Sequence, residues 1–354
     1  MKTSLLVILS GCLALTICGC GKEEEPAAEL RPLKLLPGQL QGLGYLNIKQ
    51  MADAGAIDKI LEMGDVQKAE GSRDRRELLR KINLDPNNDL QALAAGFEDF
   101  GKEGGDPTGA IVISGKFDAA AIYKTVKEES DKQLETITYK GCDLLKQPDE
   151  PAVIGVLGGD VFVFGDEVFT KKVIDIYKGD AKAGAMNSPL MARVKKVNDQ
   201  TFWFAADIDA PEQPNAANPQ MAMMMPGFDP SKIRAVTISG SVTEEASSLK
   251  SILDCTDADA AEGMVGGLQQ GINMMAGMSG MFTGGDPEAT KAVAELVKAI
   301  KVTADGRSAK IELTVTAELA EKLKAMAEKM QKMKGPAAGM PGAPTGNMKN
   351  FGEE

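Results

Sequence analysis

Hydrophobic and polar positions divide the chain into short strand-like runs and longer helical stretches. In the first half, runs typical of strands occur at residues 43–48, 90–97, 110–117, 136–145, 152–157 and 161–164. Helical patterns occur at about residues 56–82, 118–130 and 166–179. Asp118 and Asp166 stand where the second and third helices begin, and Asp is a favoured N-cap residue. We therefore expect sheet strands interleaved with helices.

The second half repeats this order. Its strand patterns lie at residues 201–208, 233–242, 248–253, 299–303 and 309–315, with helical patterns after Asp257 and at 318–334. The predicted fold is α+β, with two similar halves, each a largely antiparallel sheet carrying packed helices, as a tandem duplication would produce. We place the first subdomain at residues 32–182 and the second at residues 183–334.

The N-terminus has a different character. Lys2 precedes an apolar stretch from Ser4 to Cys18, and the sequence Ile17-Cys18-Gly19-Cys20 is followed at once by Gly21-Lys22-Glu23-Glu24-Glu25-Pro26. A short cationic start and an apolar stretch indicate a secretory signal. The whole resembles the lipobox of bacterial lipoproteins. The resemblance implies cleavage after residue 19, a lipid on Cys20, and display on a membrane outside the cytoplasm, on the periplasmic or surface side.

Two alternatives bear on this assignment. Leu9-Ser10-Gly11-Cys12 also fits the lipobox pattern, but cleavage there would leave a very short apolar region and put Leu13 to Ile17 in the mature protein. A transmembrane anchor would need about 20 apolar residues, more than this stretch has. We therefore prefer Cys20, followed by a flexible tether at residues 20–31. Residues 335–354 are rich in Gly, Pro, Met and Asn, which predicts a disordered tail.

The amino-acid composition excludes several classes of catalytic site and of partner. The chain has 354 residues and no His, which removes Ser-His and Cys-His nucleophiles and most zinc sites. The net charge of −11 repels phosphate backbones and anionic headgroups, so we expect no nucleic-acid partner. We assign no catalytic residue, cofactor or metal. The absence of His does not exclude catalysis by a pair of carboxylates or by a Ser-Lys dyad.

Methionine is unusually common, with 19 residues. Met side chains adapt to irregular apolar surfaces, and soft thioethers can also bind copper(I). The Gly- and Met-rich stretch 263–285 carries no charge before Asp286, and its many glycines predict a weak helix or a mobile surface segment. The candidate apolar binding surface consists of Met221, Met223, Met224, Met225, Met274, Met275, Met278 and Met281.

Acidic residues and cysteines supply further candidates. The spacing Asp85-x-Asn87-x-Asp89 matches the first three ligand positions of a calcium loop, but the Gly and the distant bidentate Glu are missing, since position twelve is Gly96. Asp254, Asp257, Asp259 and Glu262 form a second acidic group, in which Asp257 is better explained as a helix cap. Downstream of Cys20 the chain has only Cys142 and Cys255, which could form a disulfide or remain two buried thiols.

The leading hypothesis is a membrane-anchored envelope lipoprotein with a non-catalytic binding or scaffolding role. Its partners would be the membrane, through the lipid anchor, and an unidentified protein or apolar ligand. The alternative is a His-independent enzyme using carboxylates or Ser and Lys, which would need a deep polar pocket holding such a pair.

Overall fold

The structure is a computed structural model. It describes residues 31–66, 75–99, 108–130, 132–195, 197, 199–208, 229–243, 245–283 and 285–333. The predicted leader, the predicted tail and all of the tether except Arg31 lie outside these residues. No helix in the described part of the chain is long and apolar enough to cross a membrane.

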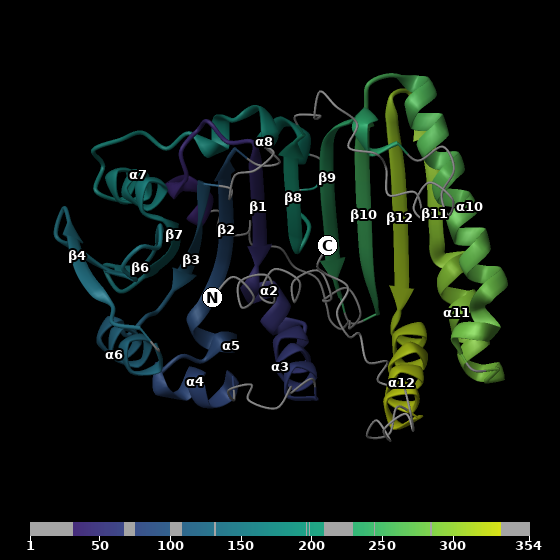
Figure 1. Ribbon diagram of the computed structural model, residues 1–354, viewed down its shortest axis with the longest axis horizontal. Helices are drawn as coiled ribbons and strands as arrows, with labels where there is room; N and C mark the ends of the chain where they lie inside the picture. Colours follow the sequence, from purple (N-terminus) through teal and green to yellow (C-terminus); the bar gives the residue numbers. More distant parts are fainter. Residues whose placement is uncertain are drawn as a thin grey trace, which may run out of the picture.

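One antiparallel sheet of twelve strands runs through both halves (Figure 1). In sheet order the strands are β11 (Ile300–Asp305), β12 (Ser308–Thr316), β10 (Ala246–Cys255), β9 (Ile233–Val242), β8 (Phe202–Asp207), β1 (Gly42–Asn47), β2 (Leu90–Glu98), β3 (Thr108–Gly115), β7 (Val161–Asp166), β6 (Ala152–Leu157), β5 (Cys142–Lys146) and β4 (Glu135–Tyr139).

The sheet confirms the predicted α+β class and the two similar halves. Outward from the centre, the first half runs β1-β2-β3-β7-β6 and the second half runs β8-β9-β10-β12-β11, so the two orders correspond strand for strand. The halves do not form separate sheets, because β1 pairs directly with β8. The first half adds the hairpin β4-β5 at its outer edge.

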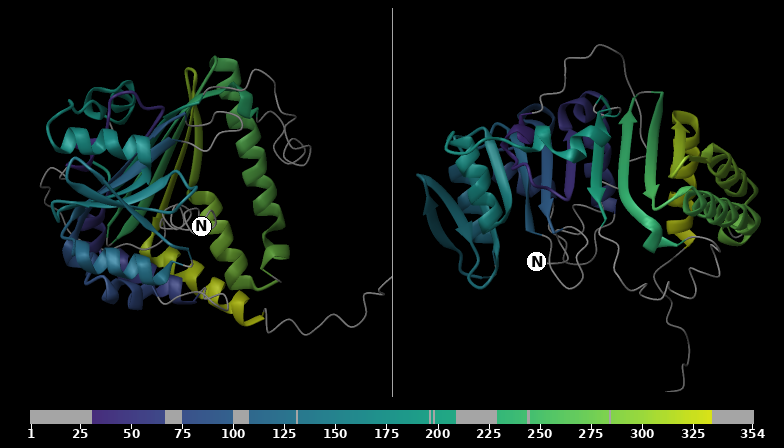
Figure 2. Two further views of the ribbon diagram at one scale, coloured as in Figure 1. Left: turned by 60° about the vertical axis from the view of Figure 1, so that its left-hand side comes forward. Right: turned by 90° about the horizontal axis from the view of Figure 1, so that it is seen from above.

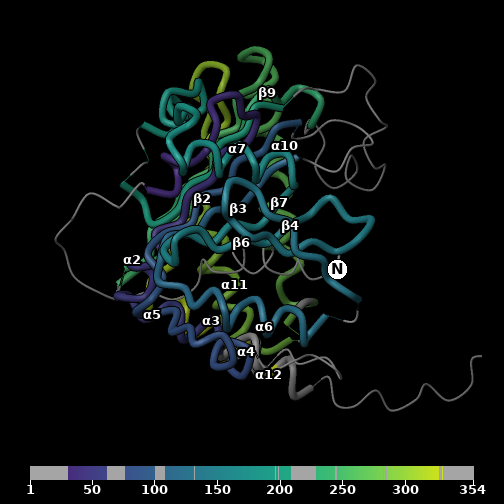
Figure 3. Tube along the Cα trace, turned by 90° about the vertical axis from the view of Figure 1, so that its left-hand side faces the viewer, coloured from purple at the N-terminus to yellow at the C-terminus, as the bar shows by residue number. Residues whose placement is uncertain are grey.

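Helices lie at the ends of the strands and over parts of both sheet faces (Figures 1 and 3). The helices are η1 (Pro32–Leu35), α2 (Ile48–Asp53), α3 (Ala56–Val66), α4 (Arg75–Lys81), α5 (Pro86–Asp89), α6 (Ala119–Glu129), α7 (Glu167–Tyr177), η2 (Ala185–Asn187), α8 (Pro189–Val194), η3 (Pro230–Lys232), α10 (Ala258–Phe282), α11 (Pro287–Ala299) and α12 (Ala317–Met333).

The N-caps predicted at Asp118, Asp166 and Asp257 are confirmed, and a further Asp residue caps a helix in the same way. The carboxylates of Asp118, Asp166, Asp257 and Asp286 accept backbone N–H bonds at the starts of α6, α7, α10 and α11. One strand prediction was wrong, because residues 136–145 form a hairpin. Lys140 and Gly141 both have positive φ, 48° and 75°, which is the geometry of a two-residue type I′ turn.

Alternate residues of each strand point to opposite faces of the sheet. Face A carries Tyr45 and Trp203, whose rings stack at 5.7 Å; face B carries Gly44 and Phe204, one position along. The largest core cluster covers face A of the first half and of β8, under η1, α7, η2 and α8. It takes Leu190, Val194 and Trp203 from beyond residue 182, so this core spans both predicted subdomains.

Candidate ligand-binding face

Face B has a different cover. At one end, the Tyr123 hydroxyl of α6 bonds to backbone groups of β5 and β6, and Val156 beneath it is buried. At the other end, α10, α11 and α12 contact β10, β11 and β12. α6 follows β3 and α10 follows β10, so the two helices hold equivalent places in the chain order of the two halves. Of the two, α10 runs alongside the sheet with α11 and α12 (Figure 2), whereas α6 reaches the sheet through Tyr123.

Between these ends, face B carries a run of apolar, partly exposed side chains, of which Leu46 packs with the buried Val242 against α2 and α3. Register pairing places Leu93 and Ala95 of β2 beside Ile113 and Ile111 of β3, and the run continues through β7, β1, β8 and β9. We name this set the apolar face: Phe162, Phe164, Ile111, Ile113, Leu93, Ala95, Leu46, Phe202, Phe204, Val236 and Ile238. Each member is neither fully buried nor fully exposed.

Two glycines shape the apolar face. A Cβ at Gly240 would lie 2.5 Å from Cζ of Phe202 and 2.4 Å from the carbonyl oxygen of Ser248. A Cβ at Gly44 would lie 3.3 Å from Cδ2 of Phe204. The phenyl rings of Phe202 and Phe204 therefore lie beside glycine positions. The other members of the face are aliphatic or aromatic, with no charged group among them.

The Met-rich helix continues the apolar character from the second half. At 3.6 residues per turn, Met264, Leu268, Met275 and Met278 fall within about 80° of one another on α10. Met264 is 0% exposed in the core cluster under β10 and β12, whereas Met275 and Met278 are 41% and 37% exposed. One stripe is thus buried at its start and exposed further along, where α10 diverges from the strands (Figure 2, left).

These observations change the methionine prediction. Residues 258–282 form one regular helix, so of the two alternatives the helix is confirmed and the mobile segment is wrong, and Met264 belongs to the core. Met275, Met278 and Met281 are exposed, Met281 to 78%, and Met274 is partly exposed. The other predicted members, Met221, Met223, Met224 and Met225, lie outside the described residues, as does Cys20.

The two downstream cysteines do not form a disulfide. Cys142 and Cys255 are free thiols, and each is buried in a different core cluster. Cys142 begins β5 and Cys255 ends β10, with seven strands between them in the sheet. A disulfide needs Cα atoms within about 7 Å, and neighbouring strands alone are about 4.8 Å apart. The alternative of two buried free thiols is confirmed.

The acidic candidates serve as caps and ion-pair partners. Asp85 caps α5 and accepts the Asn87 N–H at 3.0 Å, and hydrogen bonds from Asn88 and Asn87 hold the pKa of Asp85 below its usual value. Asp254 accepts bonds from Arg193 and Ser308, both at 2.6 Å. Among the described residues, no group of three or more Asp, Glu or Cys side chains could hold a metal ion.

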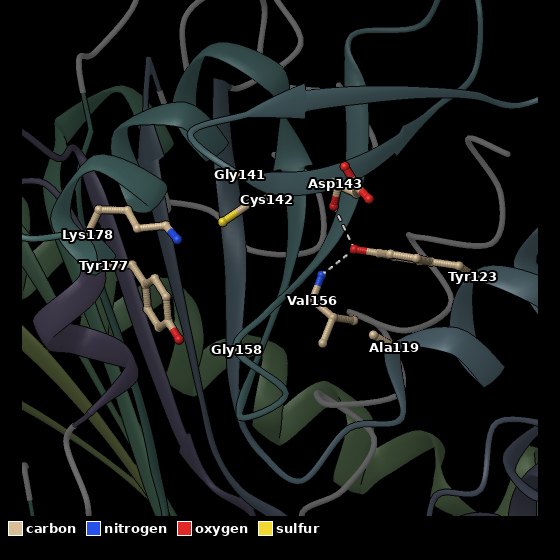
Figure 4. A pocket seen from close by; sticks show the side chains of 9 residues that line it. All are labelled: Ala119, Tyr123, Gly141, Cys142, Asp143, Val156, Gly158, Tyr177 and Lys178. Carbon is tan, nitrogen blue, oxygen red and sulfur yellow. Dashed lines mark hydrogen bonds between the residues drawn. The ribbon is translucent and has the colours of Figure 1, made fainter.

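A cavity of about 370 Å³ lies at the outer end of the first half, between α6, α7 and the β5-β6 strands (Figure 4). Tyr123 donates to the Asp143 carbonyl at 2.6 Å and accepts the Val156 N–H at 2.9 Å, and burial raises its pKa. Asp143 supplies the single carboxylate of the lining, and its side chain accepts the Thr138 hydroxyl at 2.7 Å. The lining contains Lys178 but no Ser. The cavity therefore lacks the carboxylate pair or Ser-Lys pair that the enzyme hypothesis requires.

Comparisons with known proteins leave the function open. No family model and no curated protein matches the chain. Among solved structures, the chain is similar to TP0453: crystal form III gives a TM-score of 0.45 at 11% identity, covering 83% of this chain and 98% of that one. Crystal form I gives a TM-score of 0.41 at 11% identity, covering 83% and 97%. Both TM-scores are below 0.5, so the match assigns no function to this chain.

Sequence reasoning found the exposed methionines of α10 but missed the apolar face. The signal was present in strands such as Ala110–Ile113 and Phe202–Ala206, where both alternating positions are apolar. Such runs are typical of strands covered on both faces. What the sequence did not reveal is that much of face B between β7 and β9 stays partly exposed, while α2 and α3 pack on it only around Leu46 and Val242.

Proposed function

We propose that this chain is a membrane-anchored envelope lipoprotein whose body binds an apolar ligand or partner without catalysing a reaction. The observation that carries the binding role is the apolar face, an uncharged surface spread over six neighbouring strands and partly exposed. Contiguous exposed apolar surface is typical of ligand-binding and interaction sites. The exposed methionines of α10 extend the same kind of surface.

Anchoring would supply the location for this role. A lipid on Cys20 would hold the body at the membrane through the tether, which an extended chain could stretch to roughly 3.4 Å per residue. Apolar molecules concentrate in membranes, so a binding surface held nearby meets them at high local concentration.

Nile red, an uncharged dye that fluoresces in apolar surroundings, tests the binding role. We expect the mature polypeptide to enhance its fluorescence, and Ile113→Asp to reduce the enhancement at least severalfold, because a carboxylate would stand in the middle of the apolar face. The matched control is Val168→Asp, which changes an apolar side chain that is 63% exposed in the first turn of α7, away from face B. Equal enhancement by both variants would contradict the proposal.

A further inference from the structure

We propose that the apolar face holds the acyl chain of a membrane lipid whose headgroup is uncharged or zwitterionic. This inference rests on the proposed function and names the ligand class for the same surface. It is carried by the chemistry of the lining, by the dimensions of the face, by the helices at its ends and by the charge of the protein.

The lining matches hydrocarbon better than it matches a protein. A protein interface carries about one hydrogen bond per 100–200 Å² and a polar rim. Every member of the apolar face, from Phe162 on β7 to Ile238 on β9, has a side chain without a hydrogen-bonding group. A peptide would find nothing there to satisfy its polar backbone, whereas an acyl chain requires only apolar contact.

The dimensions also fit a lipid chain. The apolar face crosses β7, β3, β2, β1, β8 and β9, which is five strand spacings. At about 4.8 Å per spacing, it extends roughly 24 Å. The hydrocarbon core of a bilayer is about 30 Å thick, so the acyl chains of one leaflet reach about 15 Å. One acyl chain laid across the strands would therefore find apolar contacts along its whole length.

The flanking helices disfavour a second copy of this chain as the occupant. Two sheets pack face to face at about 10 Å, so each would have to approach the other over a broad area. Here the Tyr123 hydroxyl of α6 is bonded to the backbone of β5 and β6 at one end, and α10 to α12 pack against β10, β11 and β12 at the other (Figure 2). A thin hydrocarbon chain can lie between these helices, whereas another sheet would meet them first.

The charge of the protein selects the headgroup. The chain carries a formal charge of −11, which repels anionic headgroups at long range. Zwitterionic or uncharged headgroups meet no such repulsion. The exposed stripe at Met275 and Met278 would adapt to chains of different shape, because Met side chains are flexible.

The test uses the mature polypeptide with Cys20→Ala, expressed without its leader, so that no attached lipid competes. Lysophosphatidylcholines with acyl chains of increasing length, used below their micelle concentrations, displace a fluorescent lysophosphatidylcholine. We expect affinity to rise about fourfold per added methylene, as expected for burial of each CH₂ in an apolar site. Lysophosphatidylglycerol of equal chain length should bind more weakly at low salt.

Two variants locate the site. Phe204→Asp should weaken lysophosphatidylcholine binding by at least tenfold, while Val168→Asp should not change it. Ala95→Phe adds bulk without charge, so it should weaken long chains more than short ones. Thermal unfolding of each variant checks the fold, and the chain-length series on the unsubstituted polypeptide does not depend on any variant.

The outcomes separate the two proposals. If Nile red binds but lysophosphatidylcholine affinity does not depend on chain length, the acyl-chain inference fails and the proposed function stands. If neither probe binds, both fail. A dimer that Phe204→Asp dissociates, without lipid binding, would assign the face to a second copy and overturn the inference. Chain-length dependence that persists unchanged in Phe204→Asp and Ala95→Phe would place the lipid elsewhere and overturn it too.

Discussion

At the scale of single residues, the shape of the apolar face depends on positions where a side chain cannot fit. Gly240 is such a position, because its Cβ would meet both the Phe202 ring and the Ser248 carbonyl oxygen at 2.5 Å or less. The carbonyl belongs to the backbone of the neighbouring strand and cannot move aside as a side chain can. The absence of a Cβ at residue 240 thus allows Phe202 to lie flat on the sheet.

We expect Gly240→Val to lower the free energy of unfolding by about 1–3 kcal/mol, the usual cost of overpacking. Chemical denaturation measures it. The control is Gly266→Ala on α10, where a Cβ meets nothing within 4 Å. That substitution should instead stabilise the protein, by about 0.5–1 kcal/mol, since Ala favours a helix over Gly. Destabilisation by both substitutions to the same extent would contradict this explanation.

Glu167 offers a pH-dependent prediction. Its carboxylate accepts from Lys146 at 2.7 Å and from Lys171 at 2.6 Å, and these bonds lower its pKa. A carboxyl whose pKa is lower in the folded protein stabilises it above the unfolded pKa, near 4.3, and loses that contribution as pH falls through the folded pKa.

Glu167→Gln should therefore lower stability at pH 7, by no more than about 1 kcal/mol because the site is partly exposed to solvent. The difference between the two proteins should shrink as pH falls below about 4. Urea denaturation at a series of pH values measures it. A difference that stays constant down to pH 3 would show that Glu167 contributes through packing and not through its charge.

At the scale of elements, α10 combines a packed start with a later part whose methionines are exposed, although Ser279 and Thr283 at its end are buried. Its N-terminal turns contribute Ala261 and Met264 to a core cluster, and both side chains are 0% exposed. Further along, Gly277 and Gly280 have no atom within 4 Å of a built Cβ, and Met278 is 37% exposed. Exposed side chains and poor helix formers together favour local opening.

We expect the rate of amide hydrogen exchange to differ between the first and the second part of α10. Amides near Met264 should exchange slowly, and amides from about Met275 to Phe282 should exchange at least tenfold faster in the free protein. Lysophosphatidylcholine should slow the second group if it contacts that stripe. Gly277→Ala with Gly280→Ala should also slow it, by strengthening the helix without any ligand. Uniformly slow exchange along α10 would remove the methionine stripe from the binding surface.

Local patterns explain how much of the fold the sequence predicted. The strand at Ile233–Val242 was predicted with its observed bounds, and so were the Asp N-caps, because alternation and capping are local signals. The β4-β5 turn was missed because Lys140 adopts a left-handed conformation that only Gly141 signalled. Pairing of β1 with β8 depends on contacts between distant segments, so neither the joined sheet nor the incomplete cover of face B could be predicted.

At the scale of the whole molecule, lipidation at Cys20 remains a prediction from the lipobox. Cys20→Ala should abolish incorporation of radiolabelled fatty acid and move the body from the membrane fraction. Cys12→Ala should change neither, since cleavage at residue 12 would leave too short an apolar region. Labelling that survives Cys20→Ala, or that depends on Cys12, would show that the cleavage site is assigned wrongly.

The joined sheet also determines how the body folds. Residues 32–182 were predicted as a subdomain, yet the core over face A takes Leu190, Met191, Val194, Trp203 and Ala205 from beyond that boundary. Without them, Tyr45 would lose its stacking partner, and β1 would become an open edge with unpaired backbone groups. Burial of each large side chain contributes about 1.5–3 kcal/mol, and a whole domain is stable by only about 5–15 kcal/mol.

We therefore expect a chain ending at residue 182 to lack a cooperative unfolding transition, whereas a chain of residues 30–334 folds in the absence of lipid. Near-ultraviolet circular dichroism and thermal melting measure both. Extending the short chain to residue 208 adds α8 and β8, restores the Trp203 stacking and completes the face A core, so it should recover part of the transition. If residues 32–182 melt cooperatively by themselves, the first half is an independent domain. The pairing of β1 with β8 would then only join two domains that each fold without the other.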